Sequence, residues 1–477
     1  MGGRRRIASG MLLLLVGATL GAGAATPGAQ LWVNRWDGPD HGTDHANFVA
    51  ASPDGSRVFV TGYTGGIFGY DGHSDYGTVA YDPATGAQLW GKRYNGTGNS
   101  DDHARSIAVS PNASRVFVTG WSYGAGGNSD YATVAYDAVT GTQLWAARYN
   151  STFDDGDEAL SVTVSPDGSR VFVTGDSRGL NGNTDADYAT LGYDASTGAQ
   201  LWVSRYADPV NSDDVASAVV ASSDGSKVFV TGWIGAQTGP DYGTVAYDAS
   251  SGAQLWARSY NGPGNAFDSA LGIAANPDGS KVYVTGWSER SVVDTDYATI
   301  AYDASTGSRL WLRRYNGPLN GSDTAYAIAV TPDGAAVVVT GQSDLPSGFC
   351  RQNGCNYATV AYSATTGAQR WVKRYNGPDQ SEDAALAVTI SPDSSKVFVT
   401  GFSYGLSSSY DYATVAYGIQ AGAQLWVSRY NGPANEWDYG FSVAVSPDGS
   451  KVFVTGASSA GTEDYDEDYA TVAYSTT

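Results

Sequence analysis

Histidine is the residue type whose placement in this chain most directly suggests chemistry. The chain has four histidines among 477 residues, and all of them fall in one early region: His41, His45, His73 and His103. His45 and His103 occupy the same repeat position, each directly after an aspartate, in the pairs Asp44-His45 and Asp102-His103. Imidazoles with nearby carboxylates bind Zn²⁺ or Cu²⁺, so these six side chains form one hypothesis for a metal site. The alternative is that they are loop histidines left by repeat duplication, because their spacing matches no named metal motif.

A second candidate is a set of aspartates that recur at one place in a repeat. Each lies 12 residues after a tryptophan and 18 residues before the glycine of a Val-Thr-Gly triplet: Asp44, Asp102, Asp157, Asp214, Asp268, Asp323, Asp383 and Asp438. A ring of carboxylates at the mouth of a channel suits a hard cation such as Ca²⁺. We favour another interpretation, a cap that accepts backbone N–H groups in the loop before each strand, because one ligand does not need eight copies.

Two further patterns predict structural pairs. An aspartate precedes the third strand of most repeats, as Asp296 does, and we expect it to pair with the arginine that ends the fourth strand, as Arg314 does. Cys350 and Cys355 are the only cysteines of the chain. Their spacing predicts a local disulfide that staples one loop.

The elements that must position these residues come from an internal repeat of 54 to 60 residues. In the first full copy, four β-branched or apolar runs are separated by turn residues: Asp44 to Ala51, Arg57 to Gly62, Asp75 to Tyr81 and Gln88 to Tyr94. Such runs are typical of strands joined by hairpins, so each repeat is expected to form a four-stranded antiparallel meander with strands A, B, C and D. The D strands carry one tryptophan each: Trp32, Trp90, Trp145, Trp202, Trp256, Trp311, Trp371 and Trp426.

The lengths of the connections predict two different faces. All length variation lies between the Val-Thr-Gly glycine and the residue that opens strand C, where the offset runs from 9 to 15 residues. The B–C connections therefore vary on one face, while the hairpin turns of the opposite face keep a fixed length. The chain also starts with an isolated D strand at Trp32 and ends with an isolated C strand, Asp468 to Tyr474. We therefore predict an all-β fold, a single closed eight-bladed β-propeller over residues 26–477 whose N-terminal strand completes the last blade.

The start of the chain, residues 1–25, is expected to be a signal peptide. Arg4 to Arg6 precede an apolar run, Met11 to Gly21, and Ala22 to Ala24 form a small-residue cleavage signal. No cysteine follows this run and no later stretch is apolar enough to cross a bilayer, so we expect a secreted or periplasmic protein without a lipid anchor or a membrane span. The net charge of −21 excludes nucleic acid as a partner. We expect a monomer.

The repeat also carries a resemblance to known propellers. The pattern A-x-D-x-x-T-G-x-x-x-W, as in Ala80 to Trp90, resembles the tryptophan-docking motif of pyrroloquinoline-quinone (PQQ) dehydrogenases, which are eight-bladed propellers. The longer unit, from DYATVAY to the Val-Thr-Gly triplet, is similar to the bacterial β-propeller repeat of the SBBP type. The docking motif implies that each tryptophan stacks between two blades. Copies that depart from it, at Gly192, Ser363 and Gly418 to Ala421, are expected to dock less tightly.

The resemblance does not extend to the chemistry of the quinoprotein dehydrogenases. Those enzymes have adjacent cysteines over the cofactor and calcium ligands in long insertions, whereas Cys350 and Cys355 are five residues apart and no insertion here is long. PQQ is therefore not expected, and Ca²⁺ and Zn²⁺ are the ions to test. We expect a non-catalytic scaffold that binds a protein or a surface glycan, a carbohydrate ligand, through the B–C loops. The alternative is a PQQ-like quinoprotein dehydrogenase or a metal-dependent enzyme, and a central pocket of non-repeating residues would favour it, whereas a channel of repeated small residues would favour the scaffold.

Overall fold

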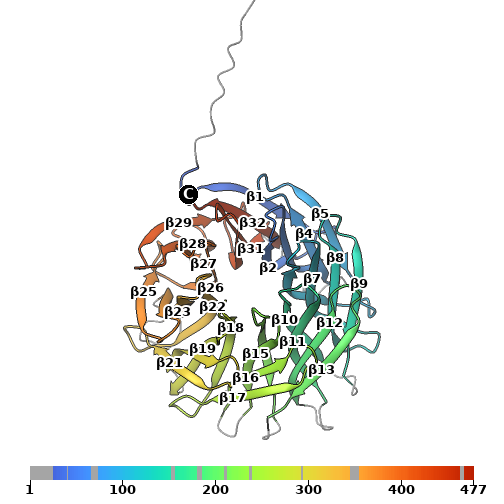
Figure 1. The fold of residues 1–477 in the computed structure, drawn as a ribbon. Helices are drawn as coiled ribbons and strands as arrows, with labels where there is room; N and C mark the ends of the chain where they lie inside the picture. The colour runs from blue at the N-terminus through green and yellow to red at the C-terminus, as the bar shows by residue number, and fades with distance from the viewer. Residues whose placement is uncertain are drawn as a thin grey trace, which may run out of the picture.

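The chain forms a ring of eight β-sheets around a central axis (Figure 1). The computed structural model describes residues 25–39, 41–65, 73–151, 156–179, 185–208, 212–235, 239–291, 294–343, 354–461 and 467–477. These residues form 32 strands and no helix, so none of the described segments could cross a membrane as a helix. Each sheet has four strands that pair in antiparallel fashion. The all-β, eight-bladed architecture predicted from the repeat is confirmed.

The strands of blades 1 to 7 run in chain order as A, B, C and D. Blade 1 consists of β2 (His45–Ala51), β3 (Val58–Thr64), β4 (Asp75–Tyr81) and β5 (Gln88–Tyr94). Blade 2 consists of β6 (Asp102–Val109), β7 (Arg115–Tyr123), β8 (Ser129–Asp137) and β9 (Gln143–Tyr149). Blade 3 consists of β10 (Asp157–Val164), β11 (Arg170–Arg178), β12 (Ala186–Asp194) and β13 (Gln200–Tyr206). Blade 4 consists of β14 (Val215–Ala221), β15 (Lys227–Ile234), β16 (Asp241–Asp248) and β17 (Gln254–Tyr260).

Blades 5 to 7 repeat the same order. Blade 5 consists of β18 (Asp268–Ala275), β19 (Lys281–Ser291), β20 (Asp294–Asp303) and β21 (Arg309–Tyr315). Blade 6 consists of β22 (Asp323–Val330), β23 (Ala336–Ser343), β24 (Asn356–Ser363) and β25 (Gln369–Tyr375). Blade 7 consists of β26 (Asp383–Ile390), β27 (Lys396–Tyr404), β28 (Tyr410–Gly418) and β29 (Gln424–Tyr430). Each A strand packs against the A strands of the two neighbouring blades, so the A strands form the innermost wall of the ring.

Blade 8 closes the ring with strands from both ends of the chain. Its A, B and C strands are β30 (Asp438–Val445), β31 (Lys451–Ser459) and β32 (Glu467–Ser475), and its D strand is β1 (Gln30–Trp36). β1 pairs with β32 in antiparallel register, with Trp36 opposite Tyr469. Beyond the ladder, the Gly28 N–H donates to the Ser475 carbonyl at 2.8 Å. The predicted completion of the last blade by the N-terminal strand is confirmed, and it leaves no unpaired C-strand edge at the junction.

The D-strand tryptophans join each blade to the next one. The indole of Trp256 in blade 4 packs on Gly307 in the C–D turn of blade 5, and a Cβ at Gly307 would lie 2.6 Å from the Trp256 ring. The indole N–H of Trp256 donates to the carbonyl of Ala304 at 3.2 Å. The same packing joins all eight tryptophans to glycines with a positive φ: Gly86, Gly141, Gly198, Gly252, Gly307, Gly367, Gly422 and Gly28. Glycine is needed there because a side chain would collide with the indole and would also strain the backbone.

Two docking contacts involve units that differ from the standard motif: the copy at Gly418 to Ala421, which is expected to dock less tightly, and blade 8, which is closed by the two chain ends. Trp371 meets the copy that lacks both Asp and Thr, yet it packs on Gly422 and donates to the Ile419 carbonyl at 2.7 Å. The tryptophan contact therefore does not require the Asp and Thr side chains. Trp426 of blade 7 packs on Gly28, where the two ends of the chain meet in blade 8, but its indole N–H has no acceptor among the described residues. This contact between blades 7 and 8 keeps the packing and loses the hydrogen bond.

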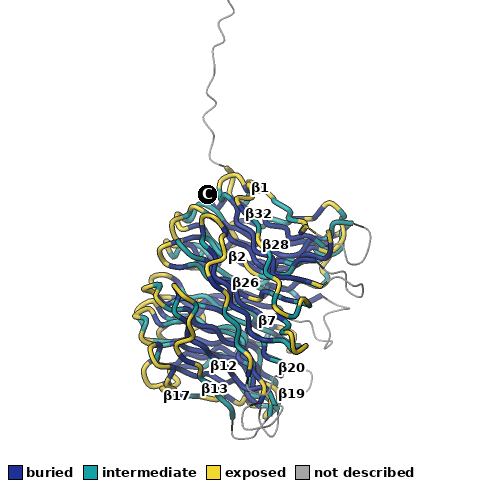
Figure 2. Tube along the Cα trace, turned by 90° about the vertical axis from the view of Figure 1, so that its right-hand side faces the viewer, coloured by how far each residue is buried: buried dark blue, intermediate teal, exposed yellow. Residues whose placement is uncertain are grey.

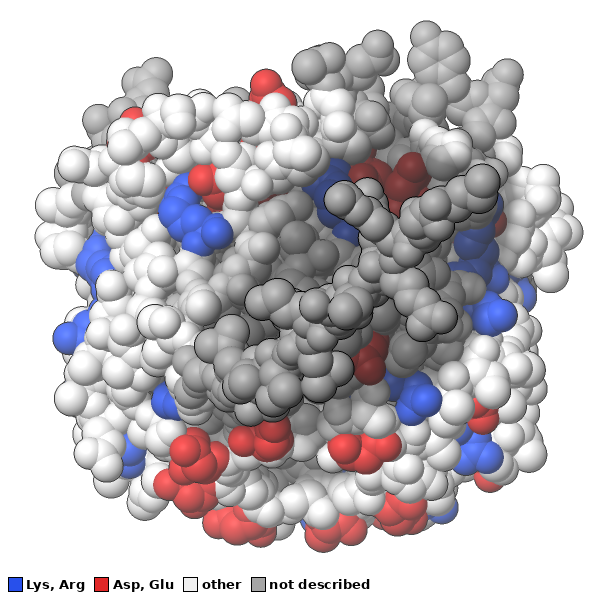
Figure 3. All heavy atoms as spheres, turned by 90° about the horizontal axis from the view of Figure 1, so that it is seen from above, with Lys and Arg blue, Asp and Glu red and all other residues white. Residues whose placement is uncertain are grey.

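The two faces of the ring differ in how strictly they repeat. The A–B and C–D hairpin turns are exposed along one face (Figure 2). Their aspartates hold the turns, as Asp303 does by accepting the backbone N–H of Ser305 at 3.0 Å and of Thr306 at 2.9 Å. Acidic side chains gather along one edge of the molecule in Figure 3, in keeping with the net charge of −21. Because the hairpin turns keep the same length in every blade, larger differences between blades must be sought on the face that carries the B–C and D–A loops.

Candidate functional site

The recurring aspartates stand at the start of the A strands and are fully buried. In blade 1, Asp44 accepts the backbone N–H of Gly38 at 2.6 Å and of Gly65 at 3.2 Å. All eight accept the backbone N–H of the residue six positions earlier, at 2.6 to 2.8 Å. Desolvation raises the pKa of Asp44 to about 6 and of Asp214 to about 7. This geometry is that of a cap for the D–A loop, and the carboxylates do not line the channel.

The aspartates that precede or open the C strands belong to a second structural network. Asp296 pairs with Arg314 at 2.8 Å, and the guanidinium also donates to the Ser288 hydroxyl at 2.5 Å and to the Tyr260 hydroxyl of the preceding blade at 3.1 Å. Equivalent ion pairs occur in five other blades, at 2.6 to 3.2 Å: Arg35–Asp468, Arg93–Asp75, Arg148–Asp130, Arg205–Asp187 and Arg429–Asp411. These arginines tie strands B, C and D of one blade together, and no substrate is needed to explain them.

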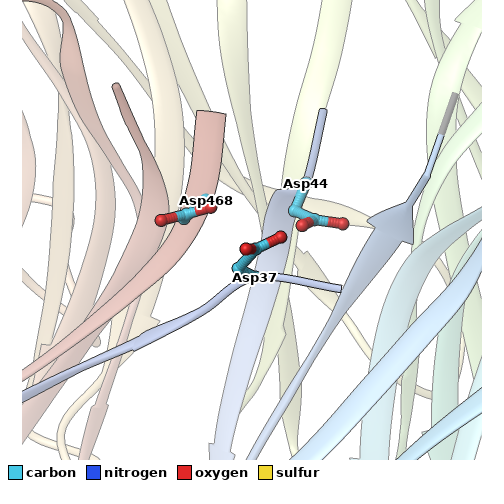
Figure 4. Close-up of side chains that lie close together, drawn as sticks. All are labelled: Asp37, Asp44 and Asp468. Atoms are coloured by element: carbon cyan, nitrogen blue, oxygen red, sulfur yellow. The ribbon is translucent and has the colours of Figure 1, made fainter. Parts of the chain in front are cut away.

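One acidic cluster lies at the seam between blades 8 and 1 (Figure 4). Asp37, Asp44 and Asp468 hold carboxylate oxygens within 4.8 Å of one another. His41 lies beside it, with Nδ1 at 2.6 Å from Asp37 Oδ2. Asp468 is already paired with Arg35 at 2.9 Å, and Asp44 is bonded to two backbone amides. The cluster is therefore largely satisfied by protein groups.

The structure does not gather the predicted metal set of four histidines with Asp44 and Asp102 into one site. Among the described residues, the sole group of three or more potential ligands is the seam cluster, which contains no histidine. His73 lies with Nδ1 at 3.9 Å from Asp101 Oδ1. Cys355 is disulfide-bonded, and Cys350 lies outside the described residues.

His45 and His103 do converge, but as aromatic rings. Both stack on Tyr63, with centroid distances of 5.2 Å for His45 and 4.1 Å for His103. His103 Nε2 lies 2.8 Å from the Ser74 hydroxyl, and His45 Nδ1 lies 3.1 Å from Asn47 Oδ1. Desolvation lowers the pKa of each imidazole to about 4. At neutral pH both rings are uncharged and are held by neighbouring polar groups.

These two histidines are part of a row of seven rings that we call the aromatic arc. The arc crosses blades 2, 1, 8 and 7 and consists of Trp121, His103, Tyr63, His45, Phe441, Tyr439 and Tyr410. Consecutive centroids lie 4.1 to 6.0 Å apart, within the range of favourable aromatic contact. Every ring of the arc is partly exposed. No equivalent row crosses blades 3 to 6 in the described part of the chain, where the position of His45 holds Glu158, Val215, Ser269 and Thr324.

At its blade 7 end the arc reaches a cavity of about 650 Å³. Its lining comes from the D–A loop and the B and C strands around blade 7 and from strand β30: Asp379, Ser381, Glu382, Phe402, Tyr404, Tyr410 and Tyr439. The Tyr410 hydroxyl donates to Glu382 Oε2 at 2.7 Å. The sequence pattern did not reveal this site, because its aromatic residues occupy different repeat positions on three different strands. The one visible signal was Tyr439, which stands where His45 and His103 stand in their own blades.

The central channel has a different lining. It encloses about 410 Å³ and is lined by A strands, with branched aliphatic residues such as Ile273 and Val388 next to small ones such as Ala327 and Gly272. Small residues repeat at one channel position in seven blades: Ser106, Ser161, Ala218, Gly272, Ala327, Ala387 and Ser442. Blade 1 carries Phe48 at that position, and Phe441 of the aromatic arc also lines the channel. The channel thus repeats small residues in seven blades, and the aromatic arc meets it at Phe441.

Comparisons with known proteins place the chain among propellers. The family model described as outer membrane protein assembly factor BamB matches residues 17–186, 75–232 and 188–459. A search of curated proteins found no match. Sqt1 of Chaetomium thermophilum, solved bound to the N-terminus of ribosomal protein L10, superposes with a TM-score of 0.60 at 12% identity, covering 92% of this chain and 98% of that one. The quinohemoprotein alcohol dehydrogenase ADHIIG of Pseudomonas putida HK5 superposes with a TM-score of 0.55 at 13% identity, covering 94% of this chain and 76% of that one.

Proposed function

The chain belongs to the family described as outer membrane protein assembly factor BamB, and on that premise we propose that it is an exported, non-catalytic propeller scaffold. It binds a protein or a surface glycan through the face that carries the B–C loops. Export rests on the predicted signal segment, residues 1–25, with its three arginines and its apolar run. The protein acts as a monomer in the secreted or periplasmic space.

The observation that carries the proposal is the aromatic arc. Partly exposed aromatic rings are enriched where proteins bind partners, because such rings bury a large apolar area at a small cost in side-chain entropy. The arc breaks the repeat on four neighbouring blades, whereas the hairpin turns keep one length and the channel keeps a small residue at one position in seven blades. A surface needed only for stability has no reason to concentrate aromatic rings on one side of a symmetric ring.

A likeness in fold is compatible with binding of a protein. Sqt1, with nearly complete coverage of both chains, was solved in complex with a segment of another protein. At 12% identity this likeness shows the fold alone. It supports the proposal only by showing that a ring of this size and shape serves as a docking platform elsewhere.

The likeness to a quinohemoprotein raises the enzymatic alternative, and that alternative requires a channel that can hold PQQ. PQQ carries three carboxylates, and a site for it needs cationic or strong donor groups. The residues that line the described channel include no lysine and no arginine, and its polar lining consists of serine and tyrosine hydroxyls. The recurring aspartates are buried as loop caps instead of facing the cavity. The residues present do not fit this cofactor.

The proposal is tested with glycan and peptide arrays probed by labelled protein. We expect a ligand that is retained by wild-type protein and is lost in Tyr63→Ala, which removes the ring on which both histidines of the arc stack. Asp167→Asn, a change in an exposed hairpin turn of the opposite face, is the control and should bind as wild type. Dye-linked oxidation of alcohols or sugars after addition of PQQ and Ca²⁺ would overturn the non-catalytic assignment.

A further inference from the structure

The cavity at the blade 7 end of the aromatic arc has the composition of a cation site. Four aromatic rings and two carboxylates meet there: Phe402, Tyr404, Tyr410, Tyr439, Asp379 and Glu382. We propose that this cavity, which we call the aromatic cage, binds the lysine or arginine side chains of a basic segment in a partner protein. This inference rests on the proposed function. The inference names both the class of partner and the place where it docks.

The orientation of the rings is the first argument. Phe402 stands nearly perpendicular to Tyr410 and to Tyr439, at 84° and 80°, with both centroids 5.1 Å away. Tyr404 also meets Tyr410 at 84° and 5.1 Å. Perpendicular rings present π faces in several directions around one space, and a cation gains from every face within about 6 Å of it. A flat platform would offer one face only.

The charge of the cage is the second argument. Asp379 is exposed, Glu382 is partly exposed, and no lysine or arginine lines the cavity. Burial, followed by the charges of Glu382 and Glu467, raises the pKa of Tyr439 to about 12, as expected for a phenol in a negative field. At the other end of the cage the arc continues into His45, whose pKa of about 4 leaves it uncharged near neutral pH. The residues that line the cage therefore attract a cation, and the positive charge of Arg105 acts on His45, which lies outside that lining.

The same features argue against a neutral sugar as the occupant. A sugar ring stacks its apolar face parallel to one exposed aromatic face, and it gains little from a negative field. Here the rings cross one another, and the Tyr410 hydroxyl is already committed to Glu382 at 2.7 Å. The whole chain has a net charge of −21, which steers basic polypeptides toward it over long range. Charge complementarity thus selects a basic protein segment.

The experiment uses the purified full chain with tetralysine and tetraarginine, followed by calorimetry at low and at moderate salt. At least one of these peptides should bind wild-type protein, and tetra(acetyl-lysine) should not, because acetylation removes the charge. Loss of one ring in Tyr410→Ala should weaken binding by about tenfold, the size expected for a desolvated cation–π contact. Tyr439→Ala repeats the test from the other blade, and an unchanged melting temperature shows that a variant is folded.

A charge-matched pair of variants distinguishes binding at the aromatic cage from general attraction of a basic peptide to an acidic protein. Glu382→Gln and Asp393→Asn each remove one negative charge from blade 7, but Asp393 lies in the A–B hairpin turn on the opposite face. Glu382→Gln should weaken peptide binding severalfold, and Asp393→Asn should leave it nearly unchanged. Equal losses in the two variants, or undiminished binding by Tyr410→Ala, would overturn the cage. Binding of a neutral oligosaccharide that Tyr410→Ala abolishes would also overturn it, while leaving the proposed scaffold function in place.

Discussion

The tryptophan that docks each blade on the next allows a prediction whose size can be worked out. Trp256 is 6% exposed, and its ring contacts Phe229 at a centroid distance of 5.8 Å and Tyr302 at 6.1 Å. Replacing a buried tryptophan by alanine costs about 3 to 5 kcal/mol through lost burial and the cavity left behind. For a folded unit of about 450 residues the unfolding entropy near 60 °C is about 1 kcal/mol per degree. Trp256→Ala should therefore lower the melting temperature by about 3 to 5 °C.

Trp426, which joins blade 7 to the chain ends in blade 8, provides the matched comparison. The Trp256 indole N–H donates to Ala304 at 3.2 Å, whereas the Trp426 indole N–H has no acceptor in the described part of the chain. Trp256→Phe removes this hydrogen bond and leaves a buried carbonyl without its donor, which costs about 1 kcal/mol more than the ring change alone. Trp426→Phe removes only part of the ring, and it also relieves an unsatisfied N–H group.

Scanning calorimetry of the two phenylalanine variants measures the difference directly. Trp256→Phe should melt about 1 °C or more below Trp426→Phe, provided that unfolding is a single cooperative transition. Equal melting temperatures, or a lower value for Trp426→Phe, would refute the assignment of the indole hydrogen bond as part of the docking contact. An unchanged melting temperature in Trp256→Ala would refute the docking role of the ring itself.

Three further predictions concern pH, metal ions and ring closure. The pKa of the buried A-strand aspartates is raised by desolvation, to about 6 at Asp44 and about 7 at Asp214, so the stability they confer is present in acid and is lost as the pH rises through 6 to 7. The lowered pKa of about 4 at His45 and His103 has the opposite effect on stability, which is then lost as the pH falls from 6.5 to 4. Because the buried carboxylates are more numerous than these two imidazoles, the melting temperature should be higher at pH 5.5 than at pH 8. A higher melting temperature at pH 8 would contradict this prediction. Zn²⁺ or Cu²⁺ should leave the melting temperature unchanged and His45→Phe should remain folded, because the two imidazoles act as stacked rings; a shift of several degrees with either metal ion would show that a site was missed. A circular permutant that begins at Gly42 and carries residues 26–41 after Thr477 should fold, whereas deletion of residues 26–36 should abolish cooperative unfolding because β32 loses β1, one of its two partner strands. Near-UV circular dichroism distinguishes the outcomes, and a folded deletion variant would contradict the closure seen at Gly28 and Ser475.

The scaffold was predictable because its signals are local and repeat eight times. The constant distance from each tryptophan to the next aspartate encodes both the D–A loop and its cap, so the position of Asp44 at the start of the A strand follows from the sequence. The orphan strands at the two ends, which pair as Trp36 with Tyr469, are visible as an incomplete repeat. Each of these inferences needs only spacing and strand propensity.

The aromatic arc was not predictable from the same signals. Tyr63 follows a Val-Thr-Gly triplet, His103 follows an A-strand aspartate, and Phe441 lies further along another A strand. In one dimension these are unrelated departures from three different repeat positions, and only the packing of neighbouring blades brings their rings together. The chemistry of the four histidines suggests a metal site, but it does not indicate that His45 and His103 stack on Tyr63 while His41 pairs with Asp37.

The central claim is that ligand binding belongs to the face with the B–C loops, and hydrogen–deuterium exchange tests it most directly. Backbone exchange would be followed with and without a saturating ligand identified on the arrays, or with tetralysine. Protection should appear in the D–A loop before β26 and around Tyr410 and Tyr439, with no change in the A–B turns such as that of Asp393. Protection confined to the hairpin turns would contradict the claim.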